Sequence, residues 1–260
     1  MLLEEFDEDR TALLEPYMVI KPIEDMPKTF VSCFSKRLMD EILKFFPFEE
    51  VGRISSYNGP KPIYKIDYNG RKIGFYLSSV GSAACCVNYE EMTARGMEKL
   101  VLFGTCGCLY KEIRDCSVII PTSAIRDEGT SYHYVKASDE IEANGKEDTE
   151  LFKSILSRHS YTYTEGKVWT TDAVYRETKE KIERRKEMGA VCVDMECSAM
   201  AAVSRFRSKR FFQFFYGADN LDGVKWDKRS LSNNKKLDAK LKIALLALEM
   251  ASMMDEEGGK

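Results

Sequence analysis

Short apolar runs alternate with stretches of helical pattern from about residue 28 to the end of the chain, and this alternation limits the possible folds more than any other feature. Strands separated by helices predict a layered α/β domain with a mostly parallel sheet, because each helix covers a face of the sheet while the chain returns to its starting edge. The strands expected at its centre are 28–34, 100–103, 167–171, 190–193 and 210–216.

The segments between these strands carry helix and turn signals. Asn69-Gly70 separates the expected strands 63–68 and 72–78, and it is a dipeptide that tight hairpin turns prefer. The expected helices are 35–46, 83–97, 149–158, 176–188, 197–206 and 237–254. Two loops are expected as well, at 104–107 directly after a buried strand and in the acidic stretch 139–150.

The length of 260 residues suits one domain with a sizeable core. The pattern predicts a single domain over 1–260, with an N-terminal extension at 1–27 and a frayed tail at 255–260. No repeat divides the chain. We therefore look for one site rather than several.

Composition and charge exclude several classes of protein. Lys and Arg number 39 and Asp and Glu 42, which gives a net charge of −3 and argues against a nucleic-acid partner held by a general basic field. The sequence contains no run of about 18 apolar residues, so we expect no membrane partner. The acidic N-terminus lacks the order of a signal peptide, so we expect a cytoplasmic protein.

The eight cysteines and two histidines give little support to a metal site. No CxxC pair occurs, and most of the cysteines lie in or beside apolar segments, where a free thiol behaves as a small hydrophobic group. We expect structural thiols and no metal.

Ligands of α/β sheets collect at the carboxyl ends of the strands, so the residues that follow each strand are the candidates for a site. Gly104 and Thr105 could hold an anion through backbone N–H groups and a hydroxyl, or could form only a tight turn. Glu196 could accept hydrogen bonds from sugar hydroxyls, or could only stabilise the start of a helix. Asp219 could be a desolvated, proton-bearing acid, or a turn-forming cap.

Four segments, taken in order, resemble the hexameric branch of the nucleoside phosphorylase superfamily, which includes purine and uridine phosphorylases and nucleosidases. The segments are SVGSAACCVNYEEM, LFGTCGCL, PTSAIRDEGTSYHY and VDMECSAM. The resemblance covers about residues 28–250. It implies a three-layer α/β/α sandwich around a central mixed β-sheet. It also implies cleavage of a nucleoside's glycosidic bond with inorganic phosphate as co-substrate and with no metal or organic cofactor.

The resemblance also assigns roles residue by residue. Met195, Glu196 and Thr105 match ribose ligands, and Asp219 matches the acid that protonates a purine base, so Glu196 and Asp219 are the expected catalytic residues. The residues expected to bind phosphate are Arg37, Gly81, Gly104 and Thr105. The residues expected at the base are Val174, Tyr175, Arg176 and Asp219, with Arg176 a candidate for the edge of a uracil.

Departures from the family pattern leave alternatives open. Leu102 stands where phosphorylases carry a second phosphate-binding arginine, and nucleosidases lack that arginine too. The first hypothesis is a phosphorylase that favours purine nucleosides over uridine. The second is a nucleosidase that uses water, and the third is a nucleoside-binding protein on a degraded scaffold. We expect a homo-oligomer, either a dimer or a hexamer, and Arg53 is the candidate for a residue donated to a neighbouring subunit's site.

Overall fold

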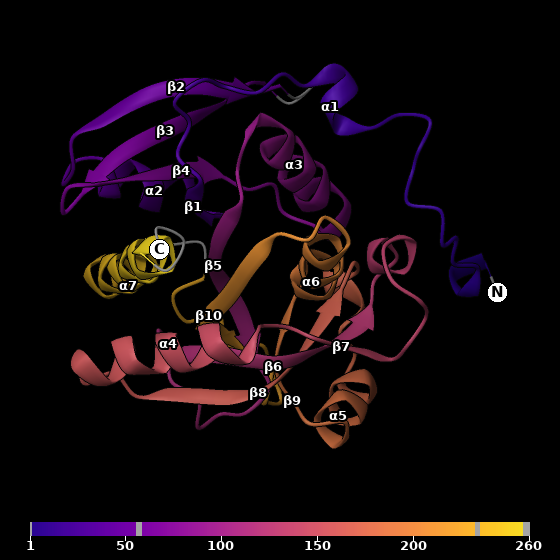
Figure 1. Ribbon diagram of the computed structural model, residues 1–260. Coiled ribbons are helices and arrows are strands. Elements are labelled where there is room, and N and C mark those ends of the chain that lie inside the picture. The colour runs from indigo at the N-terminus through magenta and orange to yellow at the C-terminus, as the bar shows by residue number, and fades with distance from the viewer. Residues whose placement is uncertain (1, 56–58, 232–234, 257–260) are drawn as a thin grey trace.

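The computed structural model describes residues 2–55, 59–231 and 235–256, and its strands form one mixed sheet (Figure 1). The strands are β1 (Thr29–Cys33), β2 (Phe48–Ile54), β3 (Lys61–Tyr68), β4 (Arg71–Leu77), β5 (Lys99–Cys108), β6 (Val118–Asp127), β7 (Glu140–Glu142), β8 (Tyr163–Thr171), β9 (Ala190–Asp194) and β10 (Arg210–Asn220). The helices are α1 (Pro16–Val19), α2 (Lys36–Ile42), α3 (Ser82–Arg95), α4 (Lys146–Arg158), α5 (Lys179–Glu187), α6 (Cys197–Phe206) and α7 (Leu237–Glu256). Three short 3₁₀ turns are η1 (Leu2–Glu4), η2 (Thr130–His133) and η3 (Val174–Arg176).

The sheet closes on itself in one part and stays open in another. Its order is β10-β6-β8-β9-β5-β1-β4-β3-β2, and β10 also pairs with β5, so that β5, β10, β6, β8 and β9 form a ring. The neighbours of β1 are parallel to it, whereas β9 is antiparallel to β5 and β6 is antiparallel to β10. The expected mixed sheet is confirmed. The parallel pairing expected from strand–helix alternation holds for β4-β1-β5-β10 and for β6-β8-β9, and the two groups join through antiparallel pairs.

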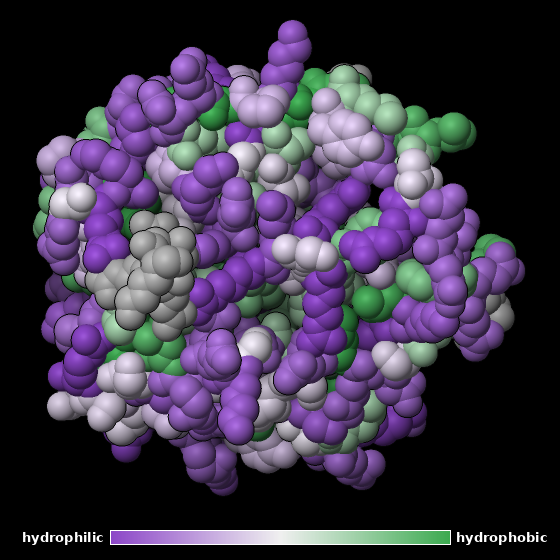
Figure 2. Space-filling model, viewed as in Figure 1, coloured by the Kyte–Doolittle hydropathy of each residue, from purple (hydrophilic) through white to green (hydrophobic). Residues whose placement is uncertain are grey.

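Helices cover both faces of the sheet, which confirms the three-layer α/β/α sandwich. In Figure 1, α4 and α7 lie on one side of the central strands, and α3 and α6 lie on the other. Each side has its own apolar cluster: α2, α4 and α7 contribute to one, and α3 and α6 contribute to the other. Figure 2 shows that the face turned to the viewer is mainly hydrophilic, with hydrophobic side chains exposed in small patches.

Several elements differ from the sequence-based expectations. Strand β5 continues through Gly104 to Cys108, where a loop was expected, because Gly104 to Cys108 pair in parallel with β10. The acidic stretch 139–150 contains β7 and the start of α4. Strand β2 was not predicted, because it is an exposed edge strand whose side chains lack a clear apolar alternation.

The turn and the ends of the chain follow the sequence more closely. Asn69 and Gly70 both have positive φ, as a tight hairpin between β3 and β4 requires. The N-terminal extension carries α1 and reaches α6, where its buried Glu15 pairs with Arg207 at 2.9 Å. Helix α7 runs to Glu256, and the rest of the expected frayed tail lies outside the described residues.

All eight cysteines are free, and seven of them are buried. In the described ranges, no helix is both long enough and apolar enough to cross a membrane.

An aromatic cluster joins the sheet to α4, and we expect it to contribute strongly to stability. Phe214 of β10 stacks on Phe103 of β5 with ring centres 5.6 Å apart, and it lies 4.4 Å from the ring centre of Phe152 in α4. We expect Phe214→Ala to lower the free energy of unfolding by about 3–5 kcal/mol, measured in urea, because the change leaves a cavity between strands and helix. The exposed Phe45→Ala is the matched control and should change it by less than about 0.5 kcal/mol. Equal losses in the two variants would contradict this view of the core.

Candidate active site

A cleft lies at the carboxyl ends of β1, β5, β9 and β10 and consists of two adjoining cavities. One cavity measures about 410 Å³ and the other about 170 Å³. Four residues line both cavities and so join them: Phe34, Val80, Thr105 and Leu231. Strand β5 ends between them, and its Thr105 side chain is exposed to the cleft. The sheet therefore brings residues that are distant in sequence to one place, as expected for the ends of parallel strands.

The buried wall of the smaller cavity is formed by Met195 and Glu196, directly before α6. The Gly81 N–H donates a hydrogen bond to Glu196 Oε1 at 2.6 Å, and Ser82 Oγ donates to the Met195 carbonyl at 2.7 Å. Gly81 has φ of +94°, a backbone conformation that favours glycine. The loop before α3 therefore fixes the carboxylate that was predicted to hold ribose. Gly81 itself, predicted to bind phosphate, directs its N–H to Glu196.

Asp194, rather than Glu196, stabilises the start of α6. Asp194 Oδ2 accepts hydrogen bonds from the backbone N–H groups of Glu196 and Cys197 at 3.0 and 2.7 Å, and its Oδ1 accepts one from Thr170 Oγ1 at 2.7 Å. The Glu196 side chain makes no capping bond to its own helix. Asp194 thus stabilises the start of α6, the alternative role considered for Glu196, and the Glu196 carboxyl lines the cavity.

Burial and nearby charge raise the pKa values of Glu196 and Asp194. Burial, and after it the nearby charge of Asp194, raises the pKa of Glu196 to about 8 against the lowering effect of the Gly81 N–H. Burial also raises the pKa of Asp194 to about 6, although its hydrogen bonds oppose the shift. A carboxyl in this state gains stability from a ligand that donates hydroxyl protons to it, because such bonds favour its charged form.

The smaller cavity carries two more acids. Asp219 is buried, and Trp226 Nε1 donates a hydrogen bond to its Oδ2 at 2.7 Å. Burial raises the pKa of Asp219, with this hydrogen bond acting in the opposite direction. Glu177 lines the same cavity, and burial together with Asp219 raises its pKa to about 7. We did not predict Glu177, although it belongs to the polar string TDAVYRET that follows β8.

The turn η3 directs Val174, which was predicted to contact the base, to the smaller cavity, and it directs Tyr175 and Arg176 elsewhere. Val174 lines the cavity, whereas Tyr175 is 97% exposed and Arg176 belongs to a separate surface depression with Lys179. The 3₁₀ turn places consecutive side chains in different directions, and it brings Glu177 to the cavity instead. Within this chain, Tyr175 and Arg176 lie outside the cavity lining, and their assignment to the base stays a prediction.

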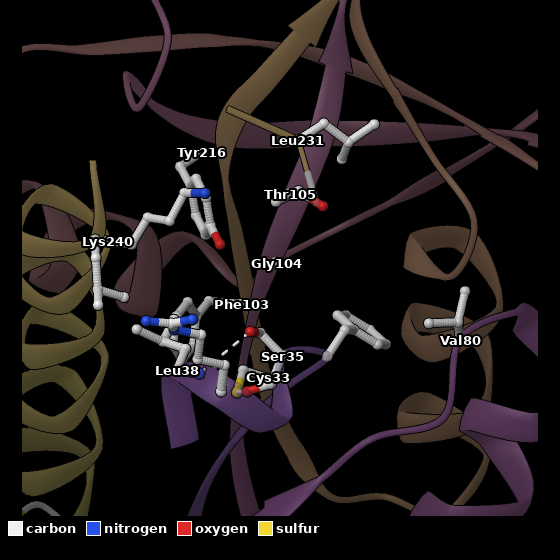
Figure 3. A pocket seen from close by; sticks show the side chains of 13 residues that line it. Cys33, Ser35, Leu38, Val80, Phe103, Gly104, Thr105, Tyr216, Leu231 and Lys240 are labelled. Carbon is white, nitrogen blue, oxygen red and sulfur yellow. Dashed lines mark hydrogen bonds between the residues drawn. The ribbon is translucent and has the colours of Figure 1, made fainter. Parts of the chain in front are cut away.

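Three of the four residues predicted to bind phosphate line the larger cavity, and Gly81 does not. Arg37, Gly104 and Thr105 line it, as does Lys240 of α7, which the sequence did not indicate (Figure 3). A Cβ atom at Gly104 would lie 2.7 Å from the Phe34 ring, so the close approach of β5 to that ring requires glycine.

Two other positions lie away from this cavity. Leu102 is fully buried in the apolar cluster shared with α3 and α6. Arg53 pairs with Glu50 at 2.6 Å on the edge strand β2 and is not part of the cleft lining.

Comparison with known proteins agrees with the fold and gives the family. The chain belongs to the phosphorylase superfamily, whose sequence pattern matches residues 31–248. It is 24% identical to guanosine phosphorylase of Halorubrum lacusprofundi over 150 residues, which are 56% of this chain and, at 62%, less than two thirds of that relative. It is 25% identical to purine nucleoside phosphorylase DeoD-type of Mycoplasma genitalium over 211 residues, 79% of this chain and 83% of the relative.

A solved structure shares the fold. The crystal structure of uridine phosphorylase from Vibrio fischeri ES114 matches with a TM-score of 0.77 and 20% identity, over 90% of this chain and 95% of that one. The family expected from the four sequence segments is therefore confirmed.

The raised pKa of Glu196 predicts a dependence of stability on pH. Between pH about 4.5 and about 8 the folded protein keeps a proton on Glu196 that the unfolded chain releases, so this group's contribution to stability falls as pH rises through that window. Glu196→Gln keeps an acceptor for the Gly81 N–H without the titration. We expect its stability relative to the wild type to improve steadily from pH about 5 to about 8, measured by urea unfolding.

The exposed Glu112→Gln is the control for the removal of one carboxyl, and its difference from the wild type should stay small at every pH. A difference between Glu196→Gln and the wild type that does not change with pH would show that Glu196 is ionised in the folded protein throughout the range.

Proposed function

We propose that this protein is a nucleoside phosphorylase that converts a nucleoside and inorganic phosphate to a free base and a pentose 1-phosphate, with purine nucleosides preferred. The observation that supports this most is the distribution of charge in the cleft. Asp219, Glu177 and Glu196 line the smaller cavity and Arg37 lines the larger one, with Thr105 shared by both. This arrangement suits a base, a sugar and an anion in one line.

The proposed reaction uses these groups for positioning and charge. Phosphate forms a bond to C1′ as the bond from C1′ to the base nitrogen breaks, through a sugar with oxocarbenium character. Glu196 would hold the ribose hydroxyls, with Met195 against the sugar, and Arg37, Gly104 and Thr105 would hold phosphate below C1′. Positioning and complementary charge supply most of the acceleration in such a scheme, which needs no metal or organic cofactor.

Two observations support a purine as the base. Burial raises the pKa of Asp219, so this acid can carry a proton to the imidazole ring of a leaving purine, and that transfer lowers the barrier. Arg176, the candidate partner for a uracil edge, lies outside the cavity lining. The names of the guanosine and purine nucleoside phosphorylase relatives agree with this preference.

The exposed rim of the cleft supports a homo-oligomer, either a dimer or a hexamer. Val80 and Val174 line the smaller cavity and are 61% and 43% exposed, and Trp226, which donates a hydrogen bond to Asp219 of that cavity, is 59% exposed. Apolar side chains in such a cluster are typical of a surface that another chain covers. Arg53 stays the candidate for a residue that reaches a neighbouring subunit's site.

The second candidate function is a nucleosidase that uses water, and Leu102 is the observation that favours it. Its buried apolar side chain leaves β5 without a phosphate-binding arginine. A nucleoside-binding protein without turnover is the third candidate.

Product analysis separates the three. The purified protein is incubated with inosine, guanosine or uridine, with and without phosphate. We expect pentose 1-phosphate, formed only when phosphate is present. Free ribose at equal rates in both buffers would establish the nucleosidase, and base binding without turnover would establish the third candidate.

The assignment of Glu196 to ribose predicts a loss of activity without loss of the fold. Glu196→Ala should lower kcat/KM by about 10²–10³-fold, because charge-assisted hydrogen bonds to the sugar are lost in the transition state. The measurement is steady-state phosphorolysis, with circular dichroism to confirm folding. Glu112→Ala, at an exposed position outside the cleft, should keep wild-type rates. Full activity in folded Glu196→Ala would remove Glu196 from the mechanism.

The assignment of Asp219 to the base predicts an effect that depends on the substrate. Asp219→Asn should slow inosine or guanosine cleavage by about 10²-fold or more, the usual scale for a lost general acid, and should change uridine cleavage little. The amide oxygen of the new side chain would still accept the Trp226 hydrogen bond. Asp222→Asn, a change three residues further on and outside the cavity lining, is the control. If wild-type protein cleaves uridine faster than inosine and Asp219→Asn has no effect, Asp219 is a structural cap.

A further inference from the structure

The charged side chains that line the larger cavity are all cations. Two cations line it, Arg37 and Lys240, and none of its described lining residues is an acid. Its hydroxyl groups come from Ser35, Thr105 and Tyr216. The adjoining smaller cavity is the opposite case, since its charged lining residues are all carboxyls. An anion is thus the ligand that suits the larger cavity, because the walls of a cavity strengthen the attraction between its cations and a counter-charge.

We propose that Lys240 of α7 is a second cationic ligand of the phosphate co-substrate and takes the place of the arginine that Leu102 replaces on β5. This inference rests on the proposed phosphorolysis. Orthophosphate carries between one and two negative charges near neutral pH, and Arg37 alone would leave part of that charge uncompensated. The family resemblance gives α7 no such role, and the lysine is visible as a candidate only because α7 packs against β1 and β5.

The position of Lys240 is fixed by its surroundings. The side chain is 8% exposed, and its Nζ donates a hydrogen bond to the Ser230 carbonyl at 2.8 Å. Ser230 is itself buried, and its hydroxyl donates to Asp115 at 2.5 Å. The carbonyl of Ser230 therefore holds the ammonium group at the cavity in a fixed orientation. A lysine anchored in this way loses little further freedom when an anion binds.

The two cations approach the cavity from different elements. Arg37 lies in the first turn of α2, directly after β1, and Lys240 lies in the first turn of α7. Figure 3 shows Lys240 entering beside Tyr216, with Gly104 and Thr105 of β5 between it and Val80. Arg37 is exposed, and in the part of the chain that the structure describes its side chain makes no ion pair or hydrogen bond, so its guanidinium group is free for a ligand. Phosphate between these side chains would receive charge from two sides and hydroxyl donors from Thr105.

The test removes the charge of Lys240 and leaves the residues of the smaller cavity unchanged. Lys240→Met should raise the KM for phosphate about 10- to 100-fold, the effect of one lost charge-assisted hydrogen bond, and should change the KM for the nucleoside less than about threefold. Lys240→Arg should restore much of the affinity for phosphate. Lys242→Met, which removes an exposed lysine from the same helix, should leave both constants unchanged.

A binding measurement keeps the test independent of turnover. Inorganic phosphate should raise the melting temperature of the wild type and of Lys242→Met, and should do so much less for Lys240→Met. If Lys240→Met does not fold, Lys240→Gln takes its place with the same expectations. A phosphate KM within twofold of wild type in a folded Lys240→Met or Lys240→Gln protein would overturn the proposal.

Failure of the proposed function gives a different pattern. Wild-type turnover that is independent of phosphate would refute the phosphorylase. Phosphate that still raises the melting temperature only when Lys240 is present would then keep Lys240 as an anion ligand, and an absence of this effect would refute both proposals.

Discussion

A short hydrogen bond, from the Gly81 N–H to Glu196 Oε1, joins the two loops on which the site depends. Its partners are 115 residues apart in sequence and 2.6 Å apart in the structure. The bond connects the loop before α3 to the turn before α6. It also requires Gly81 in a backbone conformation with positive φ, which a side chain would strain. The position of the Glu196 carboxyl at the smaller cavity therefore depends on a glycine in another segment.

The electrostatics of the cleft follow from what surrounds this bond. Asp194 uses its carboxylate for the N–H groups at the start of α6, so its charge stays close to Glu196 and raises the pKa of that residue. Strand β5, which ends in Thr105 to Cys108, lies between the acidic cavity and the cationic one. The cleft is thus divided by charge along its length. A ligand that is neutral at one end and anionic at the other is suited to it.

Much of the fold and part of the site could be predicted from the sequence, where a local signal existed. Asn69-Gly70 fixed the hairpin, and the strand-end residues Glu196 and Asp219 lie in one cavity because strand ends meet. The strand–helix pattern could not show that β9 runs antiparallel to β5 and that β6 runs antiparallel to β10, since direction depends on long-range pairing. Strand β2 escaped prediction because an exposed edge strand has little apolar periodicity.

The residues that the sequence did not indicate are those whose position depends on tertiary packing. Lys240 is one of two lysines of α7, and only the packing of α7 against the sheet brings it to the cavity. Glu177 follows a short 3₁₀ turn whose geometry decides which of several polar side chains points inward. No local pattern distinguishes either residue from its exposed neighbours.

The central claim is that one cleft holds a nucleoside and an anion at the same time, with the sugar at Glu196. A crystal structure of the protein with guanosine and sulfate tests this directly, because sulfate takes the place of phosphate without turnover. The account predicts ribose hydroxyls within hydrogen-bond distance of Glu196, the base beside Asp219, and sulfate near Arg37 and Thr105. Guanosine bound outside this cleft, or with its ribose away from Glu196, would contradict it.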